Sequence, residues 1–197
     1  AYLESFAHFT ELIRPDGFLV VHTGLKLVPR PPEGVRTYTF GHDSGDFHAA
    51  NVRVGDGTIV FDFVHPEGTI SDIELGVPVA INVDNAVSAL AAVWLTGTLT
   101  PELARKAIAS YPGVERRFEF HLKEKGPAGR AIIDDYAHHP DEIRQSIASV
   151  RALYPGRKLT VAFQPHLYSR TRDFADQFAQ ALDAADEVVL VDLYPAR

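Results

Sequence analysis

Three short segments of the chain gather side chains that can bind or transform a substrate. They read DDYAHHPDE at 134–142, FQPHLYSRT at 163–171 and DLYPAR at 192–197, and each follows a short apolar run that predicts a β-strand. The loops that leave the carboxyl ends of neighbouring parallel strands line the ligand crevice of an open α/β sheet. These segments therefore predict one site built from three loops.

The first loop places a carboxylate beside an aromatic ring and an imidazole. Asp135 can accept hydrogen bonds from a ribose or an amine, and Tyr136 and His138 can position a substrate next to it. Two alternatives stay open: a divalent metal site, because carboxylate and imidazole both ligate such ions, and a capped turn whose polar side chains face water. Adjacent His138 and His139 point in different directions from an extended segment, so we assign no metal ligand.

The second loop offers an imidazole and a guanidinium directly after a strand. Thr171 is predicted to cap the helix that follows, and a helix N-terminus beside Arg170 would bind an anion such as a carboxylate. His166 lies in the same loop. In the alternative interpretation, Arg170 pairs with Asp173 or Asp176 on the helix surface.

Two segments earlier in the chain carry further candidate ligand-binding residues. Asn82 and Asn85 stand three residues apart near a predicted helix start, where an amide can either meet an adenine edge or cap the helix. Arg116 and Arg117 are adjacent in GVERRFEF at 113–120. Side chains of adjacent residues in an extended segment face opposite ways, so at most one of the two should reach a ligand cleft, and the spacing does not decide which.

The periodicity of apolar residues predicts an α/β protein in two pieces. Region 1–112 is predicted to hold a helix at 2–13, a strand at 18–21, an antiparallel meander at 36–75 and helices at 84–96 and 101–110, the last capped by Thr100. Region 113–197 alternates strands at 130–134, 158–163 and 187–192 with helices at 141–153 and 172–184. That alternation predicts a Rossmann-like parallel sheet with right-handed crossovers.

Composition narrows the class of protein further. The 197 residues are 46% hydrophobic and carry 19 basic against 26 acidic side chains, a net charge of -7 that argues against a nucleic-acid partner. No apolar run approaches the ~20 residues that span a bilayer, so we expect no membrane partner and a cytoplasmic location. The absence of cysteine excludes disulfides and thiolate sites, and the absence of methionine leads us to expect a piece of a longer chain.

Several of these segments, taken in order, resemble the Mur ligase family. They are GVERRFEF, DDYAHHPDEI, FQPHLYSRT and FADQFAQALDAADEVVLVDLYPAR, while INVDNAVSA and AYLESFAHFTELIRPDG resemble the central ATPase domain of the same family. The resemblance implies that 1–112 is the C-terminal part of a central ATP-binding domain. It also implies that 113–197 is the N-terminal part of a Rossmann-like C-terminal domain.

The reaction implied by the resemblance is ATP-dependent amide-bond formation in peptidoglycan precursor synthesis. The carboxylate of UDP-N-acetylmuramate is phosphorylated to an acyl phosphate, which the amine of L-alanine attacks. No G-x-x-x-x-G-K-[ST] motif occurs in the chain, so the ATP phosphate cradle and the Mg²⁺ ligands are expected upstream, and the chain alone should be inactive. A ligase that recycles murein tripeptide and a non-catalytic Mur-like nucleotide-binding module are the alternatives; the oligomeric state stays open.

The resemblance also implies roles for individual residues. By position in the motifs these are Asn82 and Asn85 for adenine, Arg117 for the ATP phosphates, Asp135 for the ribose, and Tyr136, His138, His166 and Arg170 around the incoming amino acid. His138 and Arg170 are the predicted catalytic residues, with Arg170 holding the alanine carboxylate. Two positions depart from the family pattern: Ile81 replaces a common histidine, and Leu167 replaces an arginine, which weakens the case for a two-arginine clamp.

Overall fold

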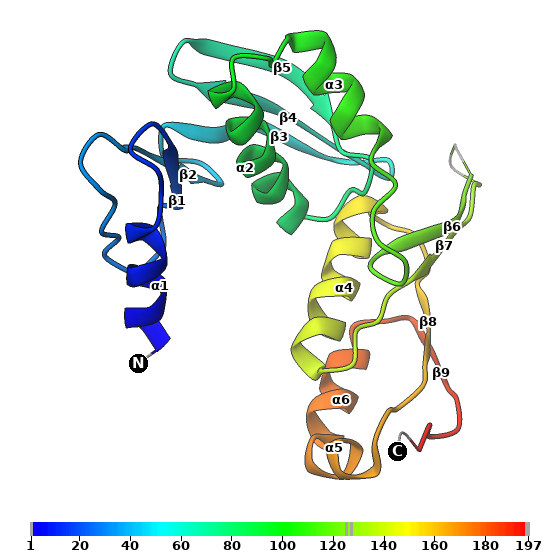
Figure 1. The fold of residues 1–197 in the computed structure, drawn as a ribbon. Coiled ribbons are helices and arrows are strands. Elements are labelled where there is room, and N and C mark those ends of the chain that lie inside the picture. Colours follow the sequence, from blue (N-terminus) through cyan, green and yellow to red (C-terminus); the bar gives the residue numbers. More distant parts are fainter. Residues whose placement is uncertain (1, 125, 127, 196–197) are drawn as a thin grey trace. The chain divides into compact units, whose positions relative to one another are not determined.

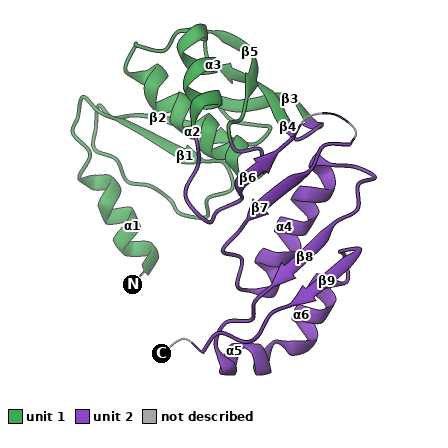
Figure 2. Cartoon of the chain, turned by 90° about the vertical axis from the view of Figure 1, so that its right-hand side faces the viewer, with its two compact units in different colours: residues 1–53, 59–76, 80–111 green, residues 54–58, 77–79, 112–197 purple. Residues whose placement is uncertain are grey.

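The computed structural model describes residues 2–124, 126 and 128–195. The chain divides into two compact units (Figure 2). Unit 1 comprises residues 1–53, 59–76 and 80–111, and unit 2 comprises residues 54–58, 77–79 and 112–197.

Unit 1 is built on a five-stranded sheet of order β1-β2-β3-β4-β5 (Figure 1). The strands are β1 (Phe18–His22), β2 (Arg36–Gly41), β3 (Phe47–Gly55), β4 (Thr58–His65) and β5 (Gly68–Glu74). β4 and β5 pair antiparallel, as predicted for the meander. β1 and β2 pair in parallel.

The predicted antiparallel meander is wrong at its beginning, because β2 and β3 pair in parallel. The segment between them is held by side chains instead of by a hairpin ladder. The Asp46 carboxylate accepts hydrogen bonds from the backbone N–H and the hydroxyl of Thr39, at 2.7 and 2.8 Å. The alternation of apolar residues along the strands does not encode these bonds.

Three helices accompany this sheet: α1 (Tyr2–Glu11), α2 (Ile81–Leu95) and α3 (Pro101–Ser110). The core is aromatic, with Phe47 stacked on Phe63 at 6.0 Å and set edge-on to Trp94 of α2 at 5.4 Å. α3 begins where predicted, because the Thr100 hydroxyl accepts a hydrogen bond from the Leu103 N–H at 3.2 Å.

The described residues of unit 2 form two separate strand pairs and three helices (Figure 2). Its elements are β6 (Glu119–Lys123), β7 (Ala131–Asp134), α4 (Pro140–Leu153), β8 (Thr160–Phe163), α5 (Tyr168–Asp173), α6 (Ala175–Leu182) and β9 (Glu187–Leu190). β6 pairs antiparallel with β7, and β8 pairs in parallel with β9. The predicted single parallel sheet is therefore not complete in the described part of the chain, where β7 pairs with β6 and not with β8.

α4 joins the two pairs and carries the core of unit 2. It begins at His139, whose ring accepts a hydrogen bond from the Asp141 N–H while Glu142 completes a capping box, with Pro140 in the first turn. Buried Ile143 and Ile147 on this helix pack in one cluster with residues of β8 and α6.

The helix predicted at 172–184 is instead two helices that meet at Phe174. Thr171 does not cap either of them, because its hydroxyl donates to the Leu167 carbonyl at 2.8 Å inside α5. Phe174 leaves helical geometry, with φ -119° and ψ 17°, and packs against the core of unit 2. None of the helices in the described residues is long and apolar enough to cross a membrane.

Candidate active site

The loop after β7 holds Tyr136 and His138 in mutual contact. Their ring centroids lie 5.1 Å apart, and Tyr136 is 44% exposed. His138 Nδ1 lies 3.1 Å from the Tyr136 carbonyl oxygen and 3.3 Å from Glu142 Oε2. The Tyr136 carbonyl can only accept, so Nδ1 carries the proton of the neutral ring and Nε2 is left as its acceptor.

Glu142 fixes this loop to the start of α4. Its carboxylate accepts hydrogen bonds from the backbone N–H groups of His138 and His139, at 2.9 and 3.2 Å. The His138 N–H is the main cause of the lowered pKa of Glu142, and the charges of the two imidazoles act in the same direction. The carboxylate is therefore an anion at neutral pH and holds the loop in place.

His138 and His139 point to different surroundings, as the extended spacing predicted. The His139 ring lies against Phe174 at 5.0 Å, edge to face, while its Nδ1 caps α4. This contact joins the loop after β7 to the segment at the α5–α6 junction. Phe174 lies three residues beyond Thr171, the last residue of the second predicted loop.

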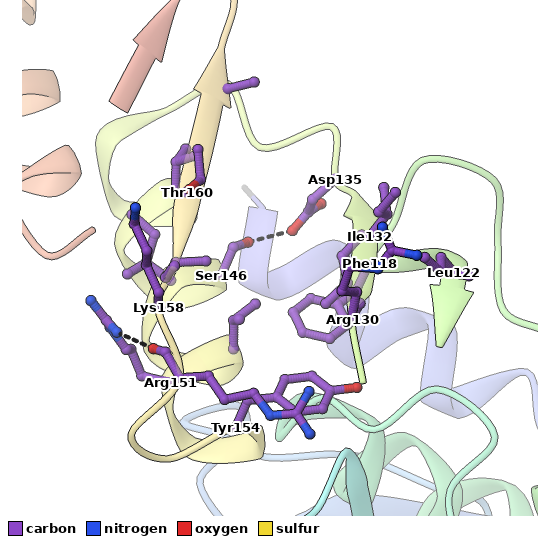
Figure 3. Close-up of a pocket in the computed structure, with 18 of the residues that line it drawn as sticks. Phe118, Leu122, Arg130, Ile132, Asp135, Ser146, Arg151, Tyr154, Lys158 and Thr160 are labelled. Atoms are coloured by element: carbon purple, nitrogen blue, oxygen red, sulfur yellow. Dashed lines mark hydrogen bonds between the residues drawn. The ribbon is translucent and has the colours of Figure 1, made fainter. Parts of the chain in front are cut away.

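Asp135 is half-buried and accepts a hydrogen bond from the Ser146 hydroxyl of α4 (Figure 3). Its side chain thus has a partner within the fold, so a ribose would share the carboxylate with Ser146. The role of Asp135 toward a ribose stays a prediction.

The loops after β8 and β9 are tied by backbone hydrogen bonds. The Leu167 N–H donates to the Tyr194 carbonyl at 3.2 Å, and the Tyr194 N–H donates to the Pro165 carbonyl at 2.9 Å. The His166 ring stacks on the Tyr194 ring with 5.3 Å between centroids and 17° between planes. The third predicted loop thus meets the second, although its residues 196 and 197 lie outside the described part of the chain.

Arg170 lies inside α5 and is half-buried. The predicted pairing with Asp173 or Asp176 is wrong, since Asp173 pairs with Arg172 at 2.8 Å and the described residues give Arg170 no ion pair. α5 begins at Tyr168, so Arg170 lies within the helix and not beside its N-terminus as predicted. The Arg170 guanidinium alone offers the positive charge predicted for this loop.

The arginines at 116 and 117 lie in a turn and not in an extended segment. Arg116 and Phe118 adopt φ values of 56° and 53°, and Phe118 is buried. The Arg116 guanidinium lies 4.9 Å above the Tyr136 ring, and its Nε is 3.7 Å from Asp134 Oδ2. Arg117, the predicted phosphate ligand, is exposed. The turn therefore directs Arg116, which the sequence did not single out, to the loop after β7.

Asn82 and Asn85 lie within α2, which starts three residues earlier than predicted. Neither caps the helix, because the N-cap position is Ala80 and carries no side-chain cap. Asn85 Nδ2 donates to Asn82 Oδ1 at 3.1 Å, so the two amides sit together on one helical turn. The capping alternative is wrong, and adenine binding stays a prediction.

Possible metal ligands meet on the β6–β7 pair. Glu119, His121 and Asp134 place potential ligand atoms within 4.8 Å of one another. Arg116 already contacts two of these three side chains. Its backbone N–H donates to Glu119 Oε2 at 2.8 Å, and its guanidinium faces Asp134. An imidazole and a neighbouring arginine do not suit Mg²⁺, which prefers an all-oxygen octahedron.

Comparison with known proteins identifies the family of this chain. The family model described as "Mur ligase, glutamate ligase domain" matches residues 116–197, which contain all three loops. Over 198 aligned positions the whole chain is 54% identical to the UDP-N-acetylmuramate--L-alanine ligase of Parabacteroides distasonis. It is 53% identical to the protein of that name from Phocaeicola vulgatus. The chain belongs to the Mur ligase family.

Solved structures agree with this assignment to the Mur ligases. The chain matches the UDP-N-acetylmuramate-alanine ligase of Thermotoga maritima with a TM-score of 0.64 and 30% identity, over 80% of this chain and 34% of that one. It matches a UDP-N-acetylmuramoyl-L-alanyl-D-glutamate--2,6-diaminopimelate ligase with a TM-score of 0.72; at 20% identity, over 96% of this chain and 39% of that one, this likeness shows the fold alone. The chain spans 42% of the length of the curated relatives named above.

Sequence reasoning missed two contacts among the loops of the candidate site. Arg116, one of two adjacent candidates, reaches the loop after β7 because of the turn at 114–117. Tyr194 was seen as part of a polar loop, without a role. The sequence did hold a signal for this contact. Tyr194 stands two residues after Asp192, in the loop that follows the strand next to β8, and from there it could reach His166.

Proposed function

We propose that the protein is an ATP-dependent ligase that joins L-alanine to the carboxylate of UDP-N-acetylmuramate. The observation that carries this proposal is the match, at 54% and 53% identity over the whole chain, to two proteins named UDP-N-acetylmuramate--L-alanine ligase. In this proposal residues 1–112 are the C-terminal part of a central ATP-binding domain, and residues 113–197 are the N-terminal part of a Rossmann-like C-terminal domain.

The proposed reaction has two steps. A muramate carboxylate oxygen attacks the γ-phosphorus of ATP, and ADP leaves. The alanine nitrogen then attacks the acyl carbon, inorganic phosphate leaves, and the nitrogen loses its proton. Such chemistry depends on positioning and on neutralising negative charge, and not on a protein nucleophile.

The loops of unit 2 supply groups suited to the amino acid. Arg170 is half-buried without an ion pair among the described residues, so its guanidinium can hold the alanine carboxylate. His138 Nε2 can accept a proton from the alanine ammonium, because Nδ1 faces the Tyr136 carbonyl. His166, stacked on Tyr194, would line the same site.

The proposed ATP contacts come from three places in the sequence. Asn85 Oδ1 can accept from the adenine amino group while Nδ2 holds Asn82. Asp135 would bind the ribose and exposed Arg117 the phosphates. The Glu119 group described above does not fit Mg²⁺, so we assign the metal to no residue of this chain and route no step through it.

The test is ATP-dependent phosphate release by the full-length protein with UDP-N-acetylmuramate, comparing L-alanine with murein tripeptide as acceptor. We expect release that requires both UDP-N-acetylmuramate and L-alanine. A requirement for the tripeptide would assign the protein to recycling. No release with either acceptor would contradict ligase activity and favour a nucleotide-binding module.

A further inference from the structure

Arg116 contacts Tyr136 twice, once through its backbone and once through its side chain. The Tyr136 N–H donates to the Arg116 carbonyl oxygen at 2.6 Å. The Arg116 guanidinium lies 4.9 Å from the centroid of the Tyr136 ring. The main-chain hydrogen bond fixes the path of the loop after β7, and the cation–π contact restrains the direction of its aromatic ring.

The turn that carries Arg116 is itself held by hydrogen bonds. The Glu119 carboxylate accepts a hydrogen bond from the Arg116 backbone N–H at 2.8 Å, and the Arg117 N–H donates to the Val114 carbonyl at 3.1 Å. Arg116 has a φ of 56°, a left-handed conformation that residues other than glycine rarely adopt and that surrounding contacts must stabilise. These bonds keep the Arg116 side chain directed at the loop after β7.

The strands β6 and β7 give the Arg116 side chain a fixed base. Its Nε lies 3.7 Å from Oδ2 of Asp134, the last residue of β7. Asp134 is the direct partner of Glu119 on β6, and Glu119 holds the Arg116 backbone. The guanidinium is therefore anchored to the strand pair and extends from it to Tyr136, two residues beyond the end of β7.

Tyr136 needs this support because it lies in a loop and is 44% exposed. An exposed side chain that must be ordered when a ligand binds costs free energy, and a side chain that is ordered beforehand does not. The Tyr136 ring also touches the His138 ring, at 5.1 Å between centroids. A fixed Tyr136 therefore helps to fix the imidazole that would accept a proton from the amino acid.

The Arg116 guanidinium is less suited than that of Arg170 to bind a substrate anion. Arg170 has no ion pair among the described residues, whereas Arg116 faces the Asp134 carboxylate. A neighbouring carboxylate offsets the positive charge that an anionic ligand would meet. The contacts of Arg116 therefore favour an action through Tyr136 over direct binding of substrate.

We propose that Arg116 is a positioning residue, which holds the Tyr136 ring in the orientation that receives the amino acid. The inference rests on the proposed function, because the role of Tyr136 beside the amino acid belongs to it. Removal of the guanidinium should impair the use of L-alanine only while the Tyr136 ring is present.

The test is a cycle of four full-length proteins: the native protein, Arg116→Ala, Tyr136→Leu and the double variant. We expect Arg116→Ala to raise the KM for L-alanine roughly 3- to 30-fold, the range of a cation–π contact, and to change the KM for ATP less than about twofold. In the Tyr136→Leu background, Arg116→Ala should raise the KM for L-alanine by less than about twofold. An equal effect in both backgrounds, or a parallel rise in the KM for ATP, would overturn the proposal.

Two further variants separate this contact from a general loss of charge. Lys123→Ala is the matched control, because Lys123 lies 5.0 Å from the Phe120 ring centroid in the same kind of contact but pairs with Ala131, at the other end of β7. It should leave both KM values unchanged. Arg116→Lys keeps a positive charge and should recover part of the affinity for L-alanine. A KM as high as that of Arg116→Ala would overturn the proposal.

A second measurement does not depend on activity. Hydrogen exchange at residues 134–138 of the full-length protein should be faster in Arg116→Ala than in the native protein and in Lys123→Ala, with unchanged exchange along α4. Unchanged exchange in the loop would overturn the proposal. If the native protein released no phosphate with L-alanine, the proposed function would fail, and the exchange data would still report whether Arg116 holds the loop.

Discussion

Unit 1 buries the middle of its sheet completely, whereas the last strand of unit 2 is exposed along its whole length. Phe61, Phe63 and Ile73 on β4 and β5 are 0% exposed. On β9, Val189 is 52% exposed and Leu190 is 68% exposed. β4 and β5 find each other across a tight hairpin, while the parallel strands of unit 2 need covering elements that local sequence does not provide.

Truncating one core ring of unit 1 should have the largest effect on stability. Phe63→Ala removes a ring that stacks on Phe47, so we expect a loss of about 3–5 kcal/mol in the free energy of unfolding. Trp94, the only tryptophan in these 197 residues, touches Phe47 and reports the unfolding by fluorescence in urea. Leu190→Ala on β9 should change the stability of residues 1–197 by less than about 0.5 kcal/mol.

The same leucine sharpens the comparison between the units. If a further layer covers β9 in the full-length protein, Leu190→Ala should cost about 2–5 kcal/mol there. If Leu190→Ala has an equally small effect in residues 1–197 and in the full-length protein, β9 is an exposed edge strand in the full-length protein as well.

Removal of the guanidinium from the loop after β8 should impair use of the amino acid. Arg170→Ala in the full-length enzyme is expected to raise the KM for L-alanine roughly 10- to 150-fold, the loss of a charged hydrogen bond of about 1.5–3 kcal/mol. The KM for ATP should change little. Arg172→Ala is the matched control, because Arg172 neighbours the site but pairs with Asp173. An unchanged KM for L-alanine would remove Arg170 from this role.

Two variants in the helices of unit 1 can separate an effect on nucleotide binding from an effect on helix capping. Asn85→Ala should weaken ATP binding about tenfold, in line with one lost hydrogen bond, and leave stability nearly unchanged, because Ala80 and not Asn85 is at the N-cap. Thr100→Ala should do the reverse and cost about 1 kcal/mol of stability with normal ATP affinity. Calorimetric titration and urea unfolding of both variants check this. Normal ATP affinity in folded Asn85→Ala would leave these asparagines without a nucleotide role.

The smallest effect should be the acid sensitivity of the loop that carries His138. The N–H of His138 lowers the pKa of Glu142 below 4.5 in the folded state. Its stabilisation is therefore fully present above pH 4.5 and is lost as the pH falls through the lower, folded pKa. Glu142→Gln should be slightly less stable than the native chain at pH 7, and the difference should vanish in acid. Parallel stability curves of the two proteins from pH 7 to pH 3 would contradict this.

Much of the fold could be predicted because local signals were strong. Thr100 and Pro101 specified the start of α3, and Pro140 with Glu142 marked that of α4. The parallel pairing of β2 with β3 could not be predicted, because the alternation of apolar residues does not distinguish a parallel neighbour from an antiparallel one. The break between α5 and α6 at Phe174 could not be predicted either, because the Phe174 ring packs against a core assembled from residues distant in the sequence.

The candidate site was predictable in outline and not in detail. The loops after β8 and β9 meet through the stacking of His166 on Tyr194, and the loop after β7 reaches the α5–α6 junction through the contact of His139 with Phe174. The contact of Arg116 with the loop after β7 depends on a turn with two left-handed residues, which residue types alone do not specify.

The pairing of His166 with Tyr194 has a consequence for selectivity. A ring held by a backbone bridge and a stacked neighbour has already lost its rotational freedom when the protein folds. The roughly 0.5–1.5 kcal/mol that ordering a mobile side chain would cost on binding is therefore absent. If His166 lines the amino-acid site as we propose, such a rigid wall cannot adapt to a bulkier side chain, and an amino acid larger than the one that fits should be rejected by shape.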